Sequence, residues 1–204
     1  MKKKVLALVS IIILSCSSSL ASSVAPVPVK QTTVLVLPVV DKSGLKYSKK
    51  ELVPIYYDKI KEMFPESNFR VIAGKDAEMV VAGLKALDIA KLERQELSRM
   101  GRAVGADYVI LNQIERFQIV GKSWGFFVTY NTVYARFEMR GKVVDISNDT
   151  YLYNDFRKVE GKNVSSAVGG AGVPSGTTAA KHAISKAMIE WSQEFDIEGK
   201  QVLH

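Results

Sequence analysis

The sequence predicts an α/β fold, with helices packed on a mixed β-sheet and a long antiparallel hairpin in the second half. Two observations predict it. In the first half, short apolar β-branched runs alternate with segments of helical spacing, an order that requires crossover connections between strands. In the second half, a long segment of alternating apolar and polar residues is followed by a turn and a returning segment, which is typical of a hairpin.

The first strand is predicted at residues 33–40 (TVLVLPVV), a nearly continuous apolar run. Such a run is typical of a strand that is covered on both faces. Pro38 has no backbone donor, so we expect the far end of this strand at a sheet edge or a bulge. Asp41 to Gly44 then form a turn.

The rest of the first half is predicted to contain three helices and two strands. Residues 48–51 (SKKE) form a capping box, which predicts a helix that ends near Phe64. We expect Asp88 to cap a further helix that runs to Val104, and Gly105 to end that helix in a left-handed conformation. The other elements are a strand at 69–73, a helix at 75–87 and a strand at 106–114.

The long strand of the second half lies within residues 126–146, where the alternation is clean from Tyr134 onward. A period of two predicts one buried face and one charged outer face. Residues 150–159 return as the hairpin partner, and after a glycine-rich loop at 168–176 we expect Thr177 or Thr178 to cap a last helix that runs to Phe195. The expected buried face carries Ala135, Phe137, Met139, Gly141 and Val143, and the outer face carries Tyr134, Arg136, Glu138, Arg140 and Lys142.

The first 21 residues have the order of a secretory signal: three lysines, an apolar run and a small-residue exit. As a helix the run of about ten residues is about 15 Å long, half the hydrocarbon thickness, so a spanning helix is the poorer interpretation. Cleavage after Ala21 releases a soluble protein, whereas residues 13–16 (ILSC) resemble a lipobox, in which Cys16 is acylated. We expect a signal at 1–21, or 1–15 in a lipoprotein, then a linker at 22–32, a single α/β domain at 33–197 and a tail at 198–204.

Composition narrows the function classes. Cys16 is the only cysteine, which excludes an intramolecular disulfide and a thiolate metal cluster. The formal net charge is +7, and without residues 1–15, which hold three lysines and no acid, it is +4, with 25 basic against 21 acidic residues. That charge favours solubility and weak attraction to anionic envelope surfaces. Nucleic acid is not expected as a partner, since the protein is exported and its sequence shows no basic stripe.

No catalytic constellation is recognisable in the sequence. The two histidines are His182, expected on the surface of the last helix, and the terminal His204, too few for a triad or a zinc site. The glycine-rich loop lacks the lysine and the spacing of a P-loop. Asp41, at the end of a buried strand, is the candidate ligand position, because open sheets bind ligands at the carboxyl ends of their strands. We expect no enzyme activity, no metal and no cofactor.

Aromatic residues are densest at the start of the long strand. The cluster contains Trp124, Phe126, Phe127, Tyr130 and Tyr134. Core packing explains about half of them, since an alternating strand buries one face only. Trp124, Phe126, Tyr130 and Tyr134 are therefore the candidate interaction surface for a protein partner or a membrane interface.

The residues also carry a resemblance to a family. The segment 34–44 (VLVLPVVDKSG), the passage 105–110 (GADYVI), the long hairpin and the alanine-rich last helix resemble periplasmic domains of the curli secretion lipoprotein, the penicillin-binding-protein activator lipoprotein and the N-terminal domain of the Tol translocation protein. The likeness covers most of residues 33–195. It implies an anticodon-binding-like α/β sandwich and a role in scaffolding or activation without catalysis. Curli-type members form pores from transmembrane hairpins, but Arg136, Glu138 and Arg140 disfavour a lipid-facing hairpin here.

Three functional hypotheses follow. The first is a non-catalytic binding or assembly protein of the cell envelope, a periplasmic or outer-membrane lipoprotein accessory factor, or else a secreted one, whose partners are envelope proteins and, through the lipid anchor, the membrane. The second is an envelope hydrolase that uses two carboxylates brought together by the fold. The third is an oligomeric secretion component built from copies of this chain.

Overall fold

The structure is a computed structural model, and it describes residues 31–44, 47–83, 88–124, 128–168 and 175–204. These residues belong to one compact unit that spans Gln31–His204. The predicted signal segment with Cys16, the aromatic residue Phe126 and the centre of the glycine-rich loop lie outside the described residues.

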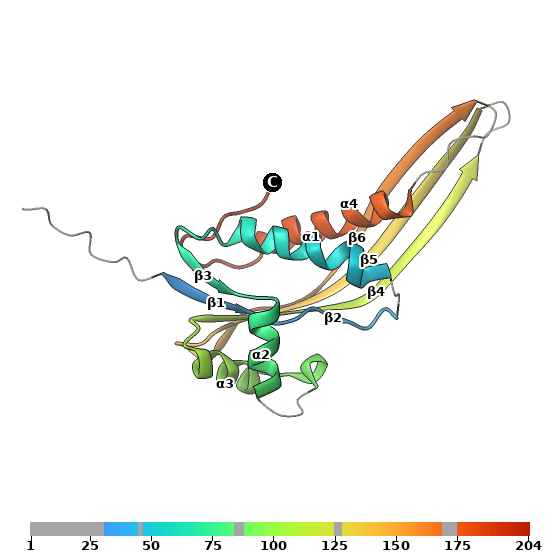
Figure 1. Cartoon of the computed structure of the whole chain (residues 1–204). Helices are drawn as coiled ribbons and strands as arrows, with labels where there is room; N and C mark the ends of the chain where they lie inside the picture. Colours follow the sequence, from blue (N-terminus) through green and yellow to red (C-terminus); the bar gives the residue numbers. More distant parts are fainter. Residues whose placement is uncertain (1–30, 45–46, 84–87, 125–127, 169–174) are drawn as a thin grey trace, which may run out of the picture. The chain divides into compact units, whose positions relative to one another are not determined.

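Six strands form one mixed sheet in the order β3-β1-β4-β5-β6, with β2 also paired to β4 (Figure 1). The short strands of the first half are parallel: β1 pairs with β3 and β4, and β2 with β4. The long strands β4, β5 and β6 are antiparallel. The mixed sheet and the long hairpin are therefore confirmed. The strands are β1 (Thr32–Val36), β2 (Val40–Asp41), β3 (Phe69–Ile72), β4 (Tyr108–Trp124), β5 (Val128–Asp145) and β6 (Thr150–Val168).

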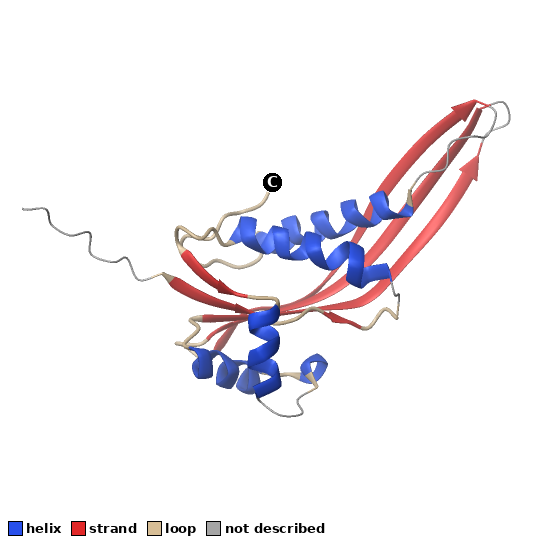
Figure 2. Cartoon of the chain, in the orientation of Figure 1, coloured by secondary structure: helices blue, strands red, loops and turns tan. Residues whose placement is uncertain are grey.

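Helices cover both faces of this sheet (Figures 1 and 2). One core lies under α1 and α4 and contains Val34 and Val36, whereas the other lies under α2 and α3 and contains Leu35 and Leu37. Because β1 faces a core on both sides, its run is apolar at successive positions, as predicted. The helices are α1 (Tyr47–Met63), α2 (Lys75–Gly83), the 3-10 turn η1 (Ile89–Lys91), α3 (Arg94–Val104) and α4 (Gly176–Ser192).

Two predicted elements are interrupted in the structure. The strand expected at 33–40 breaks around Pro38, so that β1 ends at Val36 and β2 resumes at Val40, paired only with β4. The helix expected from Asp88 to Val104 is also two elements, because Leu92 is extended (φ −63°, ψ 127°). The Asp88 side chain caps only η1, and α3 begins anew after Glu93 with a capping box. Gly105 ends α3 in the left-handed region (φ 66°), as predicted.

The ends of the chain's last helix also differ from expectation. Ser175, and not Thr177 or Thr178, is the N-cap of α4, and its hydroxyl accepts from the Thr178 N–H at 3.4 Å. The helix ends at Ser192, and the chain beyond it packs back onto the domain, where Leu203 is buried. Among the described helices, none combines the length and the apolar character that a membrane span needs.

The long strands extend further than the alternation predicted. β4 continues to Trp124 instead of Ile114, and β6 to Val168 instead of Val159. The register pairs Arg116 with Glu138 and Glu138 with Lys158, and from these positions all three strands run on together. We call the part formed by residues 116–124, 128–138 and 158–168 the arm. Figure 1 shows the arm continuing past the helices.

Candidate functional site

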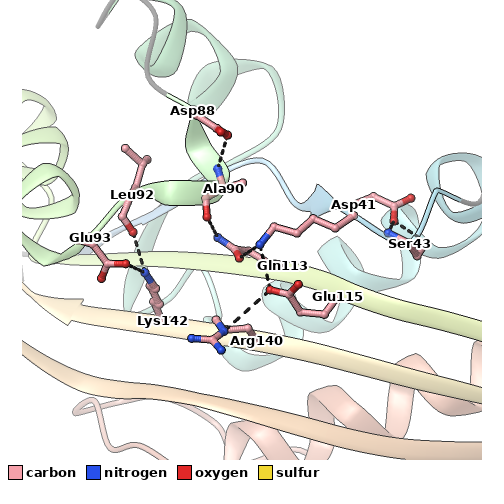
Figure 3. Close-up of polar contacts among 11 residues, drawn as sticks. Asp41, Ser43, Asp88, Ala90, Leu92, Glu93, Gln113, Glu115, Arg140 and Lys142 are labelled. Carbon is pink, nitrogen blue, oxygen red and sulfur yellow. Dashed lines mark hydrogen bonds and ion pairs between the residues drawn. The ribbon is translucent and has the colours of Figure 1, made fainter.

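The candidate site is a polar groove on the α3 side of the sheet, where η1 and the start of α3 meet β4 and β5 (Figure 3). It is an open depression of about 420 Å³. Its charged and amide side chains come from four segments that are far apart in the sequence. These polar side chains are Lys42, Glu93, Gln113, Glu115, Arg140 and Lys142, and Ala90 and Phe156 complete the lining.

Lys142 is buried, which corrects its predicted place on the outer face. Its side chain is 5% exposed, and its ammonium donates to the Leu92 carbonyl at 2.8 Å and to Glu93 Oε1 at 2.9 Å. The prediction failed because the interruption between η1 and α3 turns the Leu92 carbonyl toward the sheet and covers this position. The other outer residues from Arg136 to Arg140 alternate as predicted.

Glu93 is the carboxylate that faces Lys142. The hydrogen bond from Lys142 holds the pKa of Glu93 below its ordinary value, against the opposing effect of burial. Tyr151 donates its hydroxyl to the other oxygen of Glu93 at 3.0 Å. Burial, followed by this hydrogen bond, raises the pKa of Tyr151 to about 12. Glu93 is therefore ionised at neutral pH and holds no proton to donate as a general acid.

Gln113 links the groove to the turn after β2. Its amide is buried, donates to the Ala90 carbonyl at 2.8 Å, and accepts from the Lys42 ammonium at 2.9 Å (Figure 3). Lys42 also contacts Glu115 at 3.1 Å. Glu115 is at the register shift between Ile114 and Arg116, a β-bulge that brings its carboxylate onto the groove side. Arg140 lies on its other side, at 3.9 Å.

Asp41, the candidate ligand position, closes the turn after β2. Its Oδ1 accepts from the N–H of Ser43 at 2.9 Å and from its hydroxyl at 2.6 Å. In Figure 3 the Asp41 carboxylate is directed at Ser43, and the neighbouring Lys42 contributes to the groove instead. The position next to Asp41 is thus the one that reaches the site, because successive strand residues point to opposite faces.

Asp107 and Asp145, which are carboxylates of the kind that a hydrolase would use, and His182 also make contacts within the fold. Asp107 accepts from the Thr33 N–H at 2.8 Å, and Asp145 accepts from Ser147 and Asn148 in the turn after β5. His182 is exposed on α4, with Nδ1 3.1 Å from the Lys162 carbonyl oxygen. Within the described part of the chain, no three His, Cys, Asp or Glu side chains gather as metal ligands.

Of the predicted aromatic surface, the structure describes the side chain of Tyr134. The ring is half-buried, and the ammonium groups of Lys122 and Lys162 lie 5.6 and 5.9 Å from its centroid. These are cation–π distances. The backbone register pairs Trp124 of β4 with Tyr130 of β5 near the end of the arm.

Sequence reasoning missed most of a charged surface that adjoins the groove. The residues opposite one another in antiparallel strands share a face, so the outward side chains of β4, β5 and β6 form one surface along the arm. Only its β5 part was predicted. The signal for the rest is the alternation in 116–122 (RFQIVGK) and 158–162 (KVEGK). We call this surface the basic face; its charged residues are Arg116, Lys122, Arg136, Arg140, Lys158 and Lys162, with Glu115, Glu138 and Glu160 among them.

In comparison with known proteins, no family model matches the chain, and no curated protein matches it. Among solved structures it is similar to lipoprotein GNA1162 from Neisseria meningitidis, with 14% identity and a TM-score of 0.40 over 78% of this chain and 96% of that chain. It is similar to the LpoB C-terminal domain from Salmonella enterica, with 12% identity and a TM-score of 0.37 over 63% of this chain and 82% of that chain. It is also similar to TolB from Acinetobacter baumannii, with 17% identity and a TM-score of 0.37 over 81% of this chain and 29% of that chain.

LpoB and TolB correspond to two of the three proteins named in the resemblance. At these identities and TM-scores the likeness assigns the chain to no family.

Proposed function

We propose that this protein is a non-catalytic binding and assembly protein of the bacterial cell envelope, exported by its N-terminal signal and anchored as a lipoprotein accessory factor through Cys16. The expected partner is another envelope protein. The export signal and Cys16 support the location, and the geometry of β6 supports the mode of binding.

The observation that carries this proposal is the outer edge of β6. This strand is 19 residues long and stands last in the strand order, so its outer backbone groups pair with no other strand of the described chain. Such an edge is a template to which a partner adds a strand through backbone hydrogen bonds. Lys158 and Lys162 on the same strand disfavour indiscriminate pairing, since charged side chains protect sheet edges.

The groove supports binding without catalysis. Both of its carboxylates contact cationic side chains, Glu93 with Lys142 and Glu115 with Lys42. Glu93 is ionised, and the imidazole of His182 lies on α4, on the other face of the sheet. A network of this kind holds η1 and α3 on the sheet and offers fixed charges to a ligand.

Site-specific photocrosslinking in living cells tests the proposal. A photoreactive residue replaces Asn154, an exposed residue of β6, and, as the control, Asp58, an exposed residue of α1. We expect a crosslinked envelope protein from position 154 and none from position 58. Equal adducts from both positions, or none from 154, would contradict the proposed edge. An adduct of twice the chain's own mass would favour the oligomeric component.

Two further measurements test the lipid anchor and the non-catalytic role. Labelling with a fatty-acid analogue should mark the natural protein and not the Cys16→Ala variant, and an unlabelled natural protein would exclude the anchor. A screen on cell-wall and lipid substrates should show no turnover. Turnover that Glu93→Gln abolishes would overturn the non-catalytic assignment.

A further inference from the structure

The basic face is a regular array of charges on three paired strands. Alternate residues along a strand are about 6.6 Å apart and neighbouring strands about 4.8 Å apart. Register places Arg116, Glu138 and Lys158 in one row across the three strands, and Gln118, Arg136 and Glu160 in the next. Of the charged side chains that define this face, six are basic and three acidic, which leaves a net charge of +3.

The basic groups form the outer layer of this array. The side chains of Arg116, Arg136 and Lys158 are 61%, 58% and 68% exposed. The acidic side chains are less exposed, since Glu115 is 25%, Glu138 19% and Glu160 43% exposed, and Glu160 contacts Arg136 at 3.1 Å. Glu138 lies between Arg116 at 3.9 Å and Lys158 at 3.5 Å, so its charge is compensated from both sides. A molecule that approaches this face therefore meets cations first.

Toward the end of the arm the same face combines cations with apolar groups. Tyr134 lies between Lys122 and Lys162, and Val164, in the row of Lys122, is 49% exposed. Tyrosine beside lysine, with an exposed aliphatic side chain nearby, is typical of surfaces at the membrane interface, where the ring lies at headgroup level.

We infer that the basic face docks on a membrane surface of anionic phospholipid headgroups. This inference rests on the proposed function for the location in the envelope. The complementarity is between many spread cations and a continuous layer of phosphates. Each lysine or arginine near an anionic membrane strengthens binding about fivefold.

The length of the N-terminal segment is compatible with this docking. Gln31 is fifteen positions after Cys16, and a fully extended chain of that length spans about 50 Å. The strand β4, with 17 residues, is about 56 Å long. An acyl chain at Cys16 therefore leaves much of the basic face within reach of the bilayer, and an acyl chain with a polybasic patch is the pair of signals that gives stable attachment.

Vesicle sedimentation tests the inference. The protein is purified with Cys16→Ala, so that only its surface is measured, and mixed with phosphatidylcholine vesicles with or without phosphatidylglycerol. The face variant is Lys122→Gln with Lys162→Gln. The control is Lys61→Gln with Lys181→Gln, which removes the same charge from exposed positions on α1 and α4, on the opposite face of the sheet.

We expect binding to anionic vesicles that weakens with salt, a decrease of about 25-fold in the partition coefficient of the face variant, and less than twofold in the control. Equal losses in both variants would overturn the inference, because net charge alone would then explain binding. Equal binding to neutral vesicles, or none to anionic ones, would also overturn it.

The photocrosslinking result separates this inference from the proposed function. In one outcome the protein does not bind vesicles, position 154 gives a crosslinked adduct, and the face variant loses that adduct. This outcome would mean that the basic face recognises an acidic protein. The lipid inference would then fail while the proposed function stands. Vesicle binding without any adduct would leave the membrane docking and remove the protein partner.

Discussion

The substitution Gly161→Ala tests how closely α4 packs on the β6 strand of the arm. Gly161 lies in β6, and α4 crosses it at backbone contact. A Cβ placed on Gly161 would lie 2.1 Å from the Ala179 carbonyl oxygen and 2.4 Å from the Ala183 nitrogen. Both are backbone atoms of the helix, which no side-chain rotation can move. The methyl group therefore displaces the helix itself.

The expected cost follows from those distances. Ordinary carbon contacts begin near 3.5 Å, so α4 must retreat by roughly 1 Å, and a gap of that size forfeits about a quarter to a half of each dispersion contact along it. The buried side of α4 includes Ile184, Met188 and Trp191. Overpacking of this kind costs about 3 kcal/mol of unfolding free energy, or about 6–12 °C in Tm for a domain of this size.

Thermal and urea unfolding, followed by circular dichroism and by tryptophan fluorescence, measure the effect. Gly121→Ala is the matched control in the neighbouring part of β4, where a Cβ meets nothing within 4 Å. Gly121→Ala should raise the unfolding free energy slightly, by up to about 1 kcal/mol, because alanine restricts the conformations of the unfolded chain. If Gly161→Ala is as stable as Gly121→Ala, the close packing of α4 on β6 is wrong.

Three other predictions concern the groove and the core. Lys142→Ala should lower the unfolding free energy measured in urea by about 1–3 kcal/mol, because the Leu92 carbonyl loses its buried donor. The control Arg140→Ala should change it by less than about 0.5 kcal/mol. Similar losses in the two variants would contradict the burial of Lys142. The pKa of Glu93 is lowered in the folded state, so the ionised carboxylate contributes its full stabilisation of the fold above the ordinary pKa of 4.5 and loses it as pH falls below that value. The difference in unfolding free energy between the natural protein and Glu93→Gln should therefore shrink as pH falls below 4.5. A difference that stays constant with pH would refute the lowered pKa. Tyr56→Phe should cost about 1–3 kcal/mol, because the buried Asn112 amide loses its partner at 2.9 Å, and an unchanged urea midpoint would exclude that bond.

The fold was predictable because its signals are local. The period of two in 134–141, the apolar run of β1 and the glycine after Val104 each depend on a few neighbouring residues, and each is found as expected. The interruptions were not predictable in the same way. Leu92 fits a helical stripe as well as it fits the extended turn that it adopts, and only its packing against the sheet decides between them.

The candidate site was predictable in small part. Asp41 was expected at the ligand position, yet Lys42 next to it enters the groove, together with Gln113 and Lys142 from strands β4 and β5. The bulge at Glu115 gives no recognisable sequence signal, and it decides which carboxylate meets Lys42. Side chains that meet across strands are set by register, which is a property of the whole sheet.

The sequence by itself determined the class of fold, the charged outer side of β5 and the absence of a disulfide, because period, composition and cysteine count are properties of the linear chain. Only the tertiary structure decided that Lys142 is buried while Arg140, two residues away, is exposed, and that the cations of three strands form one face. The physical reason is that burial and electrostatic potential depend on which distant segments lie within a few ångströms of each other. Here the packing of η1 and α3 over one end of the sheet determines which side chains are buried.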